Sequence, residues 1–470
     1  MTLWPRGTPS TSLACMPGKG ACACHAQHAK FGSMLCPHHA YGTVSTATRG
    51  WATPPTPAVQ ARCFPPRRPP TATRPPIPHR RRAASGRSLH LAAVASTPGA
   101  HQGDDSDAAG LPATMIAARY ATYGAPSEVL EVRADVAVPG QGGLREDEVL
   151  VRVEAAALNA ADHKGMAGFY QRTQKRELPV TPASEVSGTV VDAGDGAAAQ
   201  ALLGREVWAD LTGLDGAFAQ YAAAPASVVG LKPASLGHAQ AAALPVAGST
   251  SLQALRQVGL SPGESVLLLG GATGCGAAGI QIAKALGAAT VCTPAAAGSH
   301  ELLQQLGADE TVDYRSVDWR EALAGRAFDV VYDCVGGRSA WVAARSRGIL
   351  APKGRYISIV GDTESRLGEP ITPARSADTI LRLLGRTARG AVTGQKYAIL
   401  FKKPSSESLD ELAGWVEAGR LRPVVEREFG PLAGPRGAEE VLGLFERAVG
   451  RAEGRVSGSS AGKLVLTIWP

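Results

Sequence analysis

The first 100 residues contain no aspartate and no glutamate, although the whole chain has 41 acidic residues. The same segment holds 12 of the 48 lysines and arginines and 15 of the 33 prolines. A segment of this composition cannot bury a hydrophobic core. The remainder has 36 basic against 41 acidic residues, so the basic pI of about 9.0 comes from the first 100 residues alone.

An arginine-rich, serine-rich start without acidic residues is typical of an organellar transit peptide. A nucleic-acid-binding arm is the alternative, but only Phe64 lies among the clustered arginines to stack on bases. We therefore interpret residues 1–100 as a disordered transit peptide and residues 101–114 as a linker, with no nucleic acid as partner. The stretch Leu91-Ala-Ala-Val-Ala-Ser96 resembles algal chloroplast processing sites, so we expect the chloroplast, with the mitochondrion as the alternative.

Long apolar runs are also missing. No run approaches the roughly 20 residues that a membrane span needs, which leaves at most a peripheral membrane contact. Only three of the eight cysteines, Cys275, Cys292 and Cys334, lie beyond the first 100 residues, too few and too scattered for a metal site. We expect no metal, and we interpret these three as small apolar residues.

A glycine-rich turn follows the apolar run Ser265–Leu269 and precedes a helical pattern. Strand, glycine turn and helix together are how dinucleotide-binding folds hold a pyrophosphate. The turn departs from G-x-G-x-x-G because Thr273 replaces the middle glycine, and an ordinary strand-to-helix turn is the alternative. Further strand-like segments at 289–292, 328–337 and 354–361 alternate with helical patterns, which indicates a doubly wound parallel sheet of the α/β class.

The segment between the linker and the glycine turn favours β-structure. Residues 148–154 alternate apolar and polar side chains, and short strand patterns follow at 186–191, 205–209 and 216–222. Short strands of this kind suit an antiparallel barrel. Residues 239–255 are helical in part, and the stretches 165–172 and 371–395 carry no motif and are expected to be loops that shape the pocket.

Six motifs follow one another along residues 115–470: Ala157-Leu-Asn-Ala-Ala-Asp162, Ser184-Glu-Val-Ser-Gly188, Gly216-Ala-Phe-Ala-Gln-Tyr221, Leu306-Gly-Ala-Asp309, Tyr332-Asp-Cys-Val-Gly-Gly337 and Gly462-Lys-Leu-Val-Leu466. In this order they resemble the zinc-free quinone oxidoreductase branch of the medium-chain dehydrogenase/reductase superfamily, including chloroplast envelope quinone oxidoreductase homologues and plastid alkenal reductases. The resemblance implies a GroES-like β-barrel catalytic domain from 115–245 and 395–470, and a Rossmann domain from 246–394. The active cleft would lie between them.

The resemblance also says which chemistry is missing. Zinc-dependent members place a cysteine where this chain has Asn159, and a His-Glu pair where it has Ser184 and Glu185. None of the nine tyrosines has a lysine four residues on, so the Tyr-x-x-x-Lys relay of short-chain reductases is absent as well. We therefore do not expect alcohol oxidation. Hydride delivery to an electron-poor carbon remains, with hydrogen-bond donors to stabilise the negative charge that develops on oxygen.

Three residues are candidates for that role. The resemblance assigns Asn159 and Lys164 to the nicotinamide and substrate pocket, and Tyr170 lies near the expected mouth. Lys164 is equally compatible with a solvated surface lysine, and Tyr170 with simple packing. Asp162 is a candidate for orienting Lys164.

The cofactor candidates lie along the predicted Rossmann domain. Thr250 and Tyr314 match family residues near the nicotinamide and the adenosine, and Val335 and Gly336 end the strand beside the nicotinamide ribose. The end of the second strand carries neither the acid of NAD enzymes nor the usual Lys or Arg of NADP enzymes, so NADPH is favoured over NADH. The other expected cofactor residues are the turn residues Gly271, Thr273, Gly274, Cys275 and Gly276 and, at the second strand's end, Ser299 and His300.

The function predicted from the sequence is an NADPH-dependent reductase of a quinone or of the C=C bond of an α,β-unsaturated carbonyl, working without zinc or flavin. The alternative is a noncatalytic NADPH-binding protein docked peripherally on a plastid membrane. Monomer and homodimer stay equally open.

Overall fold

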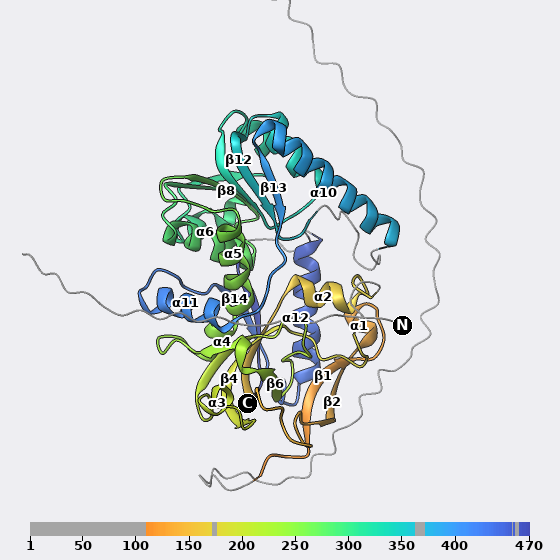
Figure 1. The fold of residues 1–470 in the computed structure, drawn as a ribbon. Helices are drawn as coiled ribbons and strands as arrows, with labels where there is room; N and C mark the ends of the chain where they lie inside the picture. The colour runs from red at the N-terminus through yellow and green to blue at the C-terminus, as the bar shows by residue number, and fades with distance from the viewer. Residues whose placement is uncertain (1–109, 172–175, 362–371, 454, 456–459) are drawn as a thin grey trace, which may run out of the picture. The chain divides into compact units, whose positions relative to one another are not determined.

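The computed structural model describes residues 110–171, 176–361, 372–453, 455 and 460–470 (Figure 1). They belong to a compact unit that extends from Gln102 to Pro470. The predicted transit peptide, residues 1–100, lies outside the described residues, and only 110–114 of the predicted linker is described. Strand β1 begins at Thr114, where that linker was expected to end.

One sheet of the described residues is largely antiparallel. Its strands follow the order β14-β15-β3-β4-β5-β7, and β6 pairs with β3. The predicted strands at 148–154, 186–191 and 205–209 are confirmed as β3, β4 and β5, whereas the predicted strand at 216–222 begins later, at Tyr221. Strands β14 and β15 run parallel to each other, which differs from a purely antiparallel barrel. The bounds are β3 Glu148–Leu158, β4 Glu185–Ala193, β5 Glu206–Asp210, β6 Tyr221–Pro225, β7 Val229–Leu231, β14 Val425–Phe429 and β15 Lys463–Thr467; β1 (Thr114–Tyr120) and β2 (Leu130–Ala137) form a separate pair.

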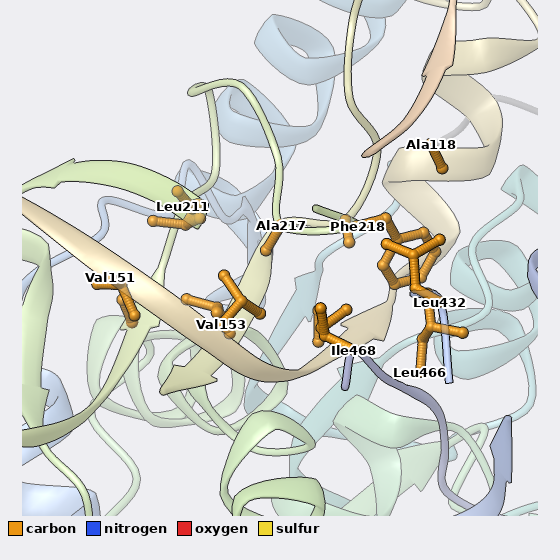
Figure 2. Packing of buried hydrophobic residues seen from close by; sticks show 14 of the residues in the cluster. Ala118, Val151, Val153, Leu211, Ala217, Phe218, Leu432, Leu466 and Ile468 are labelled. Atoms are coloured by element: carbon orange, nitrogen blue, oxygen red, sulfur yellow. The ribbon is translucent and has the colours of Figure 1, made fainter. Parts of the chain in front are cut away.

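The core of this part is built by side chains that alternate along the strands. Val151 and Val153 of β3 point to the same face, as the period of two requires, and both are buried. Figure 2 shows them with Phe218, Leu466 and Ile468 in one apolar cluster. The C-terminal strand β15 and the residues after it therefore pack into the same core as β3.

The second sheet is parallel throughout, in the order β10-β9-β8-β11-β12-β13. Its central strands are apolar runs buried on both faces, as expected of a sheet covered by helices on both sides. This strand order is that of a dinucleotide-binding sheet. The bounds are β8 Ser265–Leu269, β9 Thr290–Ala295, β10 Glu310–Asp313, β11 Phe328–Asp333, β12 Leu350–Ser358 and β13 Lys396–Ile399.

Two strands of this sheet were missed by the sequence prediction. Strand β10 has four half-buried residues, two of them acidic, and β13 is equally short. Because β13 pairs with β12, the parallel sheet continues past residue 394, where we placed the end of the Rossmann domain. The domain limits otherwise stay a prediction, while the α/β fold class with a parallel sheet is confirmed.

The predicted loop at 371–395 is wrong for most of its length, since α10 occupies Pro373–Thr393 and lies beside β13 (Figure 1). Within the described ranges, no helix is long and apolar enough to cross a membrane. The predicted helical stretch at 239–255 is divided into α4 and α5. The helices are α1 Pro126–Val129, α2 Ala160–Met166, α3 Ala197–Gln200, α4 His238–Ala242, α5 Pro245–Gln257, α6 Gly274–Ala285, α7 His300–Gln305, α8 Trp319–Ala322, α9 Arg338–Ser346, α10 Pro373–Thr393, α11 Ser406–Glu417 and α12 Gly437–Ala452, with short 3₁₀ turns η1 Ala226–Val228 and η2 Ala297–Ser299.

Candidate active site

A cleft of about 1270 Å³ lies at the carboxyl ends of β8 and β11 and extends to α2 and the start of β15. In a sheet of this order the topology switches between β8 and β11, which is where ligands bind. Both sheets contribute to its walls. Eleven of the fourteen predicted site residues line it: Asn159, Lys164, Tyr170, Thr250, Thr273, Gly274, Cys275, Ser299, Tyr314, Val335 and Gly336.

The glycine turn forms the floor of the cleft between β8 and α6. Thr273 is the N-cap of α6: its hydroxyl accepts a hydrogen bond from the amide of Gly276 at 2.9 Å and donates one to the carbonyl of Gly270 at 2.8 Å. The first-turn amides that remain to meet an anion are those of Gly274 and Cys275. The threonine therefore stabilises the glycine turn.

The other two predicted glycines lie behind the cleft wall. A Cβ on Gly276 would lie 2.1 Å from the carbonyl oxygen of Gly270, and a Cβ on Gly271 would lie 2.4 Å from the hydroxyl oxygen of Thr293 on β9. These glycines permit close packing of the turn against the sheet. His300 also lies outside the cleft lining, and its Nε2 is 3.0 Å from the carbonyl oxygen of Ala295.

The end of β11 is held by a buried carboxylate. Asp333 accepts hydrogen bonds from the amides of Val335 at 3.0 Å and Gly336 at 2.8 Å, and from the hydroxyl of Tyr356 at 2.8 Å. Burial raises the pKa of Asp333, and these hydrogen bonds oppose that rise. Gly336 has φ +85°, a conformation that favours glycine. Together they turn Val335, which is 62% exposed, toward the cleft.

A basic residue that the sequence prediction missed lies near Ser299 and Tyr314. Arg315 follows Tyr314, is exposed and lines the same end of the cleft. Among the described residues it has no side-chain hydrogen bond or ion-pair partner; the buried Ser299 lines the same cleft. The sequence prediction places a cation only at the end of the second strand, whereas Arg315 follows the third, β10.

At the opposite end, α2 and the residues after it present the three predicted polar side chains. The ammonium of Lys164 lies 5.7 Å from the ring centre of Phe169, and burial lowers the pKa of Lys164. Tyr170 packs edge-on against the same ring at 4.9 Å. Burial, and then the charge of Asp162, raise the pKa of Tyr170, so its hydroxyl keeps its proton at neutral pH.

We predicted that Asp162 orients Lys164, but the structure shows other partners for this carboxylate. It accepts hydrogen bonds from the amide of Asn159 at 2.8 Å and from the hydroxyl of Ser184. These contacts fix the start of α2. Thr250, on α5, donates its hydroxyl to the carbonyl of Val246 at 2.6 Å and lines the cleft from the other side.

A buried charge cluster adjoins Asn159, and its members were not predicted as site residues. Lys463, the first residue of β15, donates to Oδ1 of Asn159 at 2.6 Å and forms an ion pair with Glu185. Glu185 also accepts from Nδ2 of Asn159 at 3.0 Å and from the amide of Val246 at 2.8 Å. Burial raises the pKa of Glu185, and the charge of Lys463 opposes this shift.

This donor set does not fit a zinc ion. Zn²⁺ prefers thiolate, imidazole and carboxylate ligands, whereas an amide, a hydroxyl and one carboxylate stand at the corresponding positions Asn159, Ser184 and Glu185. The carboxylate is already paired with the ammonium of Lys463. In the part of the chain that the structure describes, no group of three or more His, Cys, Asp or Glu side chains could hold a metal ion.

Known families and proteins match both sheets. Residues 145–234 match the family described as the alcohol dehydrogenase GroES-like domain, and residues 306–440 match the family described as zinc-binding dehydrogenase. A 2-methylene-furan-3-one reductase of Solanum lycopersicum is 33% identical over 77% of this chain and 84% of its own length. A chloroplastic NADPH-dependent alkenal/one oxidoreductase of Arabidopsis thaliana is 30% identical over 68% of this chain and 73% of its own.

Solved structures agree with these relatives. The quinone oxidoreductase from Coxiella burnetii superposes with a TM-score of 0.61 at 28% identity, covering 76% of this chain and all of its own. Other relatives include both chloroplastic and mitochondrial proteins. The strand order, the glycine turn and these matches together show that the chain belongs to the medium-chain dehydrogenase/reductase superfamily, among the oxidoreductases that include quinone oxidoreductases and alkenal reductases.

Proposed function

We propose that the chain is an NADPH-dependent reductase that delivers hydride to a quinone or to the C=C bond of an α,β-unsaturated carbonyl, without zinc. The observation that carries this proposal is the composition of the cleft. The cleft is lined by the glycine turn and by three hydrogen-bond donors, Asn159, Lys164 and Tyr170. Bound NADPH would supply the hydride.

The part of the reaction that the protein's own side chains perform is stabilisation of the negative charge on the acceptor. When hydride reaches an enone β-carbon or a quinone ring, negative charge develops on the acceptor's oxygen. A protonated Tyr170 and the ammonium of Lys164 can both donate a hydrogen bond to that oxygen, and each well-placed donor is worth roughly 3 kcal/mol of barrier. Phe169 adds an apolar wall beside them that suits a planar acceptor.

The preference for NADPH rests on Arg315. A 2′-phosphate requires a cation where NAD enzymes place an acid, and the end of β9 has only Pro294, Ala295 and Ala296 at the cleft. The exposed guanidinium of Arg315, with the hydroxyl of Ser299 nearby, supports a phosphate subsite at this end. Neither group is the carboxylate that NAD enzymes place at the ribose 2′-hydroxyl.

The absence of zinc from the proposed reaction rests on Lys463. Its ammonium pairs with the carboxylate that a metal would need, so a Lewis acid has no complete ligand set here. The residues thus favour reduction of conjugated acceptors over oxidation of an unactivated alcohol.

The experiment is turnover by the full-length chain with a quinone and a short alkenal in parallel, using NADPH and then NADH. We expect NADPH oxidation with at least one acceptor. Binding of NADPH without oxidation in the presence of either acceptor would instead support the noncatalytic alternative.

We infer a chloroplast location from the acid-free composition of residues 1–100, which is typical of an organellar transit peptide, and from the resemblance of Leu91-Ala-Ala-Val-Ala-Ser96 to algal chloroplast processing sites. Import assays on residues 1–100 fused to a fluorescent protein test this, and fluorescence in mitochondria would overturn it. Vesicle sedimentation of the purified chain tests for a peripheral membrane contact. Light scattering of the purified chain distinguishes a monomer from a homodimer.

A further inference from the structure

Asn159 is the only asparagine among the 470 residues. Its side chain lies between two buried, oppositely charged groups. Oδ1 is 2.6 Å from the ammonium of Lys463, and Nδ2 is 3.0 Å from the carboxylate of Glu185. The Lys463 side chain is only 6% exposed and that of Glu185 is fully buried.

These two charges determine which way round the amide lies. An ammonium is only a donor and a carboxylate only an acceptor. If the amide were flipped, its NH₂ would face the ammonium of Lys463 and its oxygen would face the carboxylate of Glu185, and both hydrogen bonds would be replaced by repulsion. An asparagine between two hydroxyl groups, each able to donate or to accept, would have no such constraint.

The orientation has a chemical consequence. Nδ2 of Asn159 carries two hydrogens, and the bond to Glu185 uses one of them. The oxygen accepts from the buried ammonium of Lys463. Asn159 therefore keeps one unused N–H, and because it lines the cleft, that N–H is a donor suited to a developing oxyanion.

Lys463 also ties this amide to the cofactor turn. A Cβ on Gly274 would lie 2.6 Å from Cδ of Lys463, so the lysine stem lies directly against the start of α6. The amide of the preceding residue, Gly462, donates to the carbonyl of Ala272 at 3.1 Å. One residue of the C-terminal strand thus contacts both the glycine turn and Asn159.

We propose that Lys463 is a positioning residue which, with Glu185, holds the Asn159 amide so that an N–H and not the carbonyl oxygen faces the cleft. The catalytic value of this donor rests on the proposed function, whereas the orientation itself does not. The two parts can therefore be tested separately.

The orientation is tested by nuclear magnetic resonance on full-length protein labelled with ¹⁵N-asparagine. With a single asparagine, the spectrum holds one side-chain amide pair, and no assignment is needed. In the wild type we expect the hydrogen bonded to Glu185 to be protected from exchange with water. Lys463→Met is expected to speed that exchange by about tenfold or more, because the amide loses its fixed orientation.

Lys232→Met is the matched control. Lys232 is also a 6% exposed lysine side chain, paired with Glu206 at 3.2 Å, and it does not line the cleft. This variant should leave the exchange rate of the Asn159 side-chain amide unchanged. Should Lys463→Met fail to fold, Glu185→Met removes the carboxylate that accepts from Nδ2 of Asn159 and should give the same loss of protection. Unchanged exchange in the folded variant would overturn the proposal.

The mechanism is tested by a double-mutant cycle in the turnover assay. If Lys463 acts through Asn159, the variant Asn159→Ala/Lys463→Met should have the same kcat as Asn159→Ala alone. Multiplying effects would show that Lys463 acts on substrate or cofactor directly and would overturn the positioning role. If the wild type had no activity at all, the proposed function would fail, while the resonance experiment would still decide the orientation.

Discussion

Replacing Arg315 by glutamine should weaken the binding of NADPH without weakening the binding of NADH. The guanidinium is exposed, lines the end of the cleft near Ser299 and Tyr314, and is not engaged by another side chain in the described residues. A hydrogen bond to a charged group contributes about 1.5–3 kcal/mol, and solvent exposure reduces this to about 1–2 kcal/mol. The expected loss is therefore about 5-fold to 30-fold in NADPH affinity, with no change for NADH.

The assay is the Kd of each cofactor by titration, together with KM from turnover. Arg326→Gln serves as the control, because Arg326 is also a partly exposed arginine but pairs with Glu310 and does not line the cleft. It should change neither cofactor's affinity. Equal weakening of NADPH and NADH by Arg315→Gln, or no weakening of NADPH, would refute the assignment of a phosphate subsite to Arg315.

Three further predictions follow from the cleft. Thr273→Ala removes the N-cap of α6 and should lower the free energy of unfolding by about 1 kcal/mol, measured by urea denaturation; Thr273→Ser should retain it, and equal stability of both variants would argue against the cap. Burial raises the pKa of the Cys275 thiol to about 11, so alkylation of Cys275, followed by mass spectrometry, should be slow at neutral pH and accelerate as pH rises toward 11; fast alkylation at neutral pH would contradict this. Burial lowers the pKa of Lys164, and its donor form exists only below that pKa, so kcat should fall with rising pH at values below the ordinary lysine range, and Lys164→Met should remove this limb of the profile and lower kcat by about 100-fold.

The parallel sheet was predictable where its strands are apolar runs. Strand β8 is Ser-Val-Leu-Leu-Leu, and β11 has two valines between Phe328 and Tyr332, so most residues of both strands are apolar and buried. Strands β10 and β13 have only four residues each, with polar side chains among them, and they belong to the sheet only because neighbouring strands pair with them. Helix α10 was missed because it carries no family motif, although Ile380, Leu383 and Leu384 recur at helical spacing.

The site was predictable where its residues are close in sequence. The turn from Gly271 to Gly276 was recognised from its glycines, but Thr273 was predicted only as a cofactor residue that departs from the glycine pattern, because the hydrogen bond that makes it a helix cap cannot be read from the sequence. The ion pair of Glu185 with Lys463 joins β4 to β15, and both residues had been noted only as parts of separate motifs. A lysine at the head of an apolar strand was the available signal, since such a lysine needs a buried partner.

The most direct test of the proposed reductase is NADPH oxidation by the full-length chain with a quinone and with a short alkenal, comparing the wild type with Asn159→Ala. The wild type is expected to oxidise NADPH in the presence of at least one acceptor. Removal of the Asn159 donor should lower kcat by about 100-fold to 1000-fold with little change in NADPH affinity. Tight NADPH binding without oxidation by either acceptor, or equal turnover by the two proteins, would contradict the function and the role assigned to this cleft.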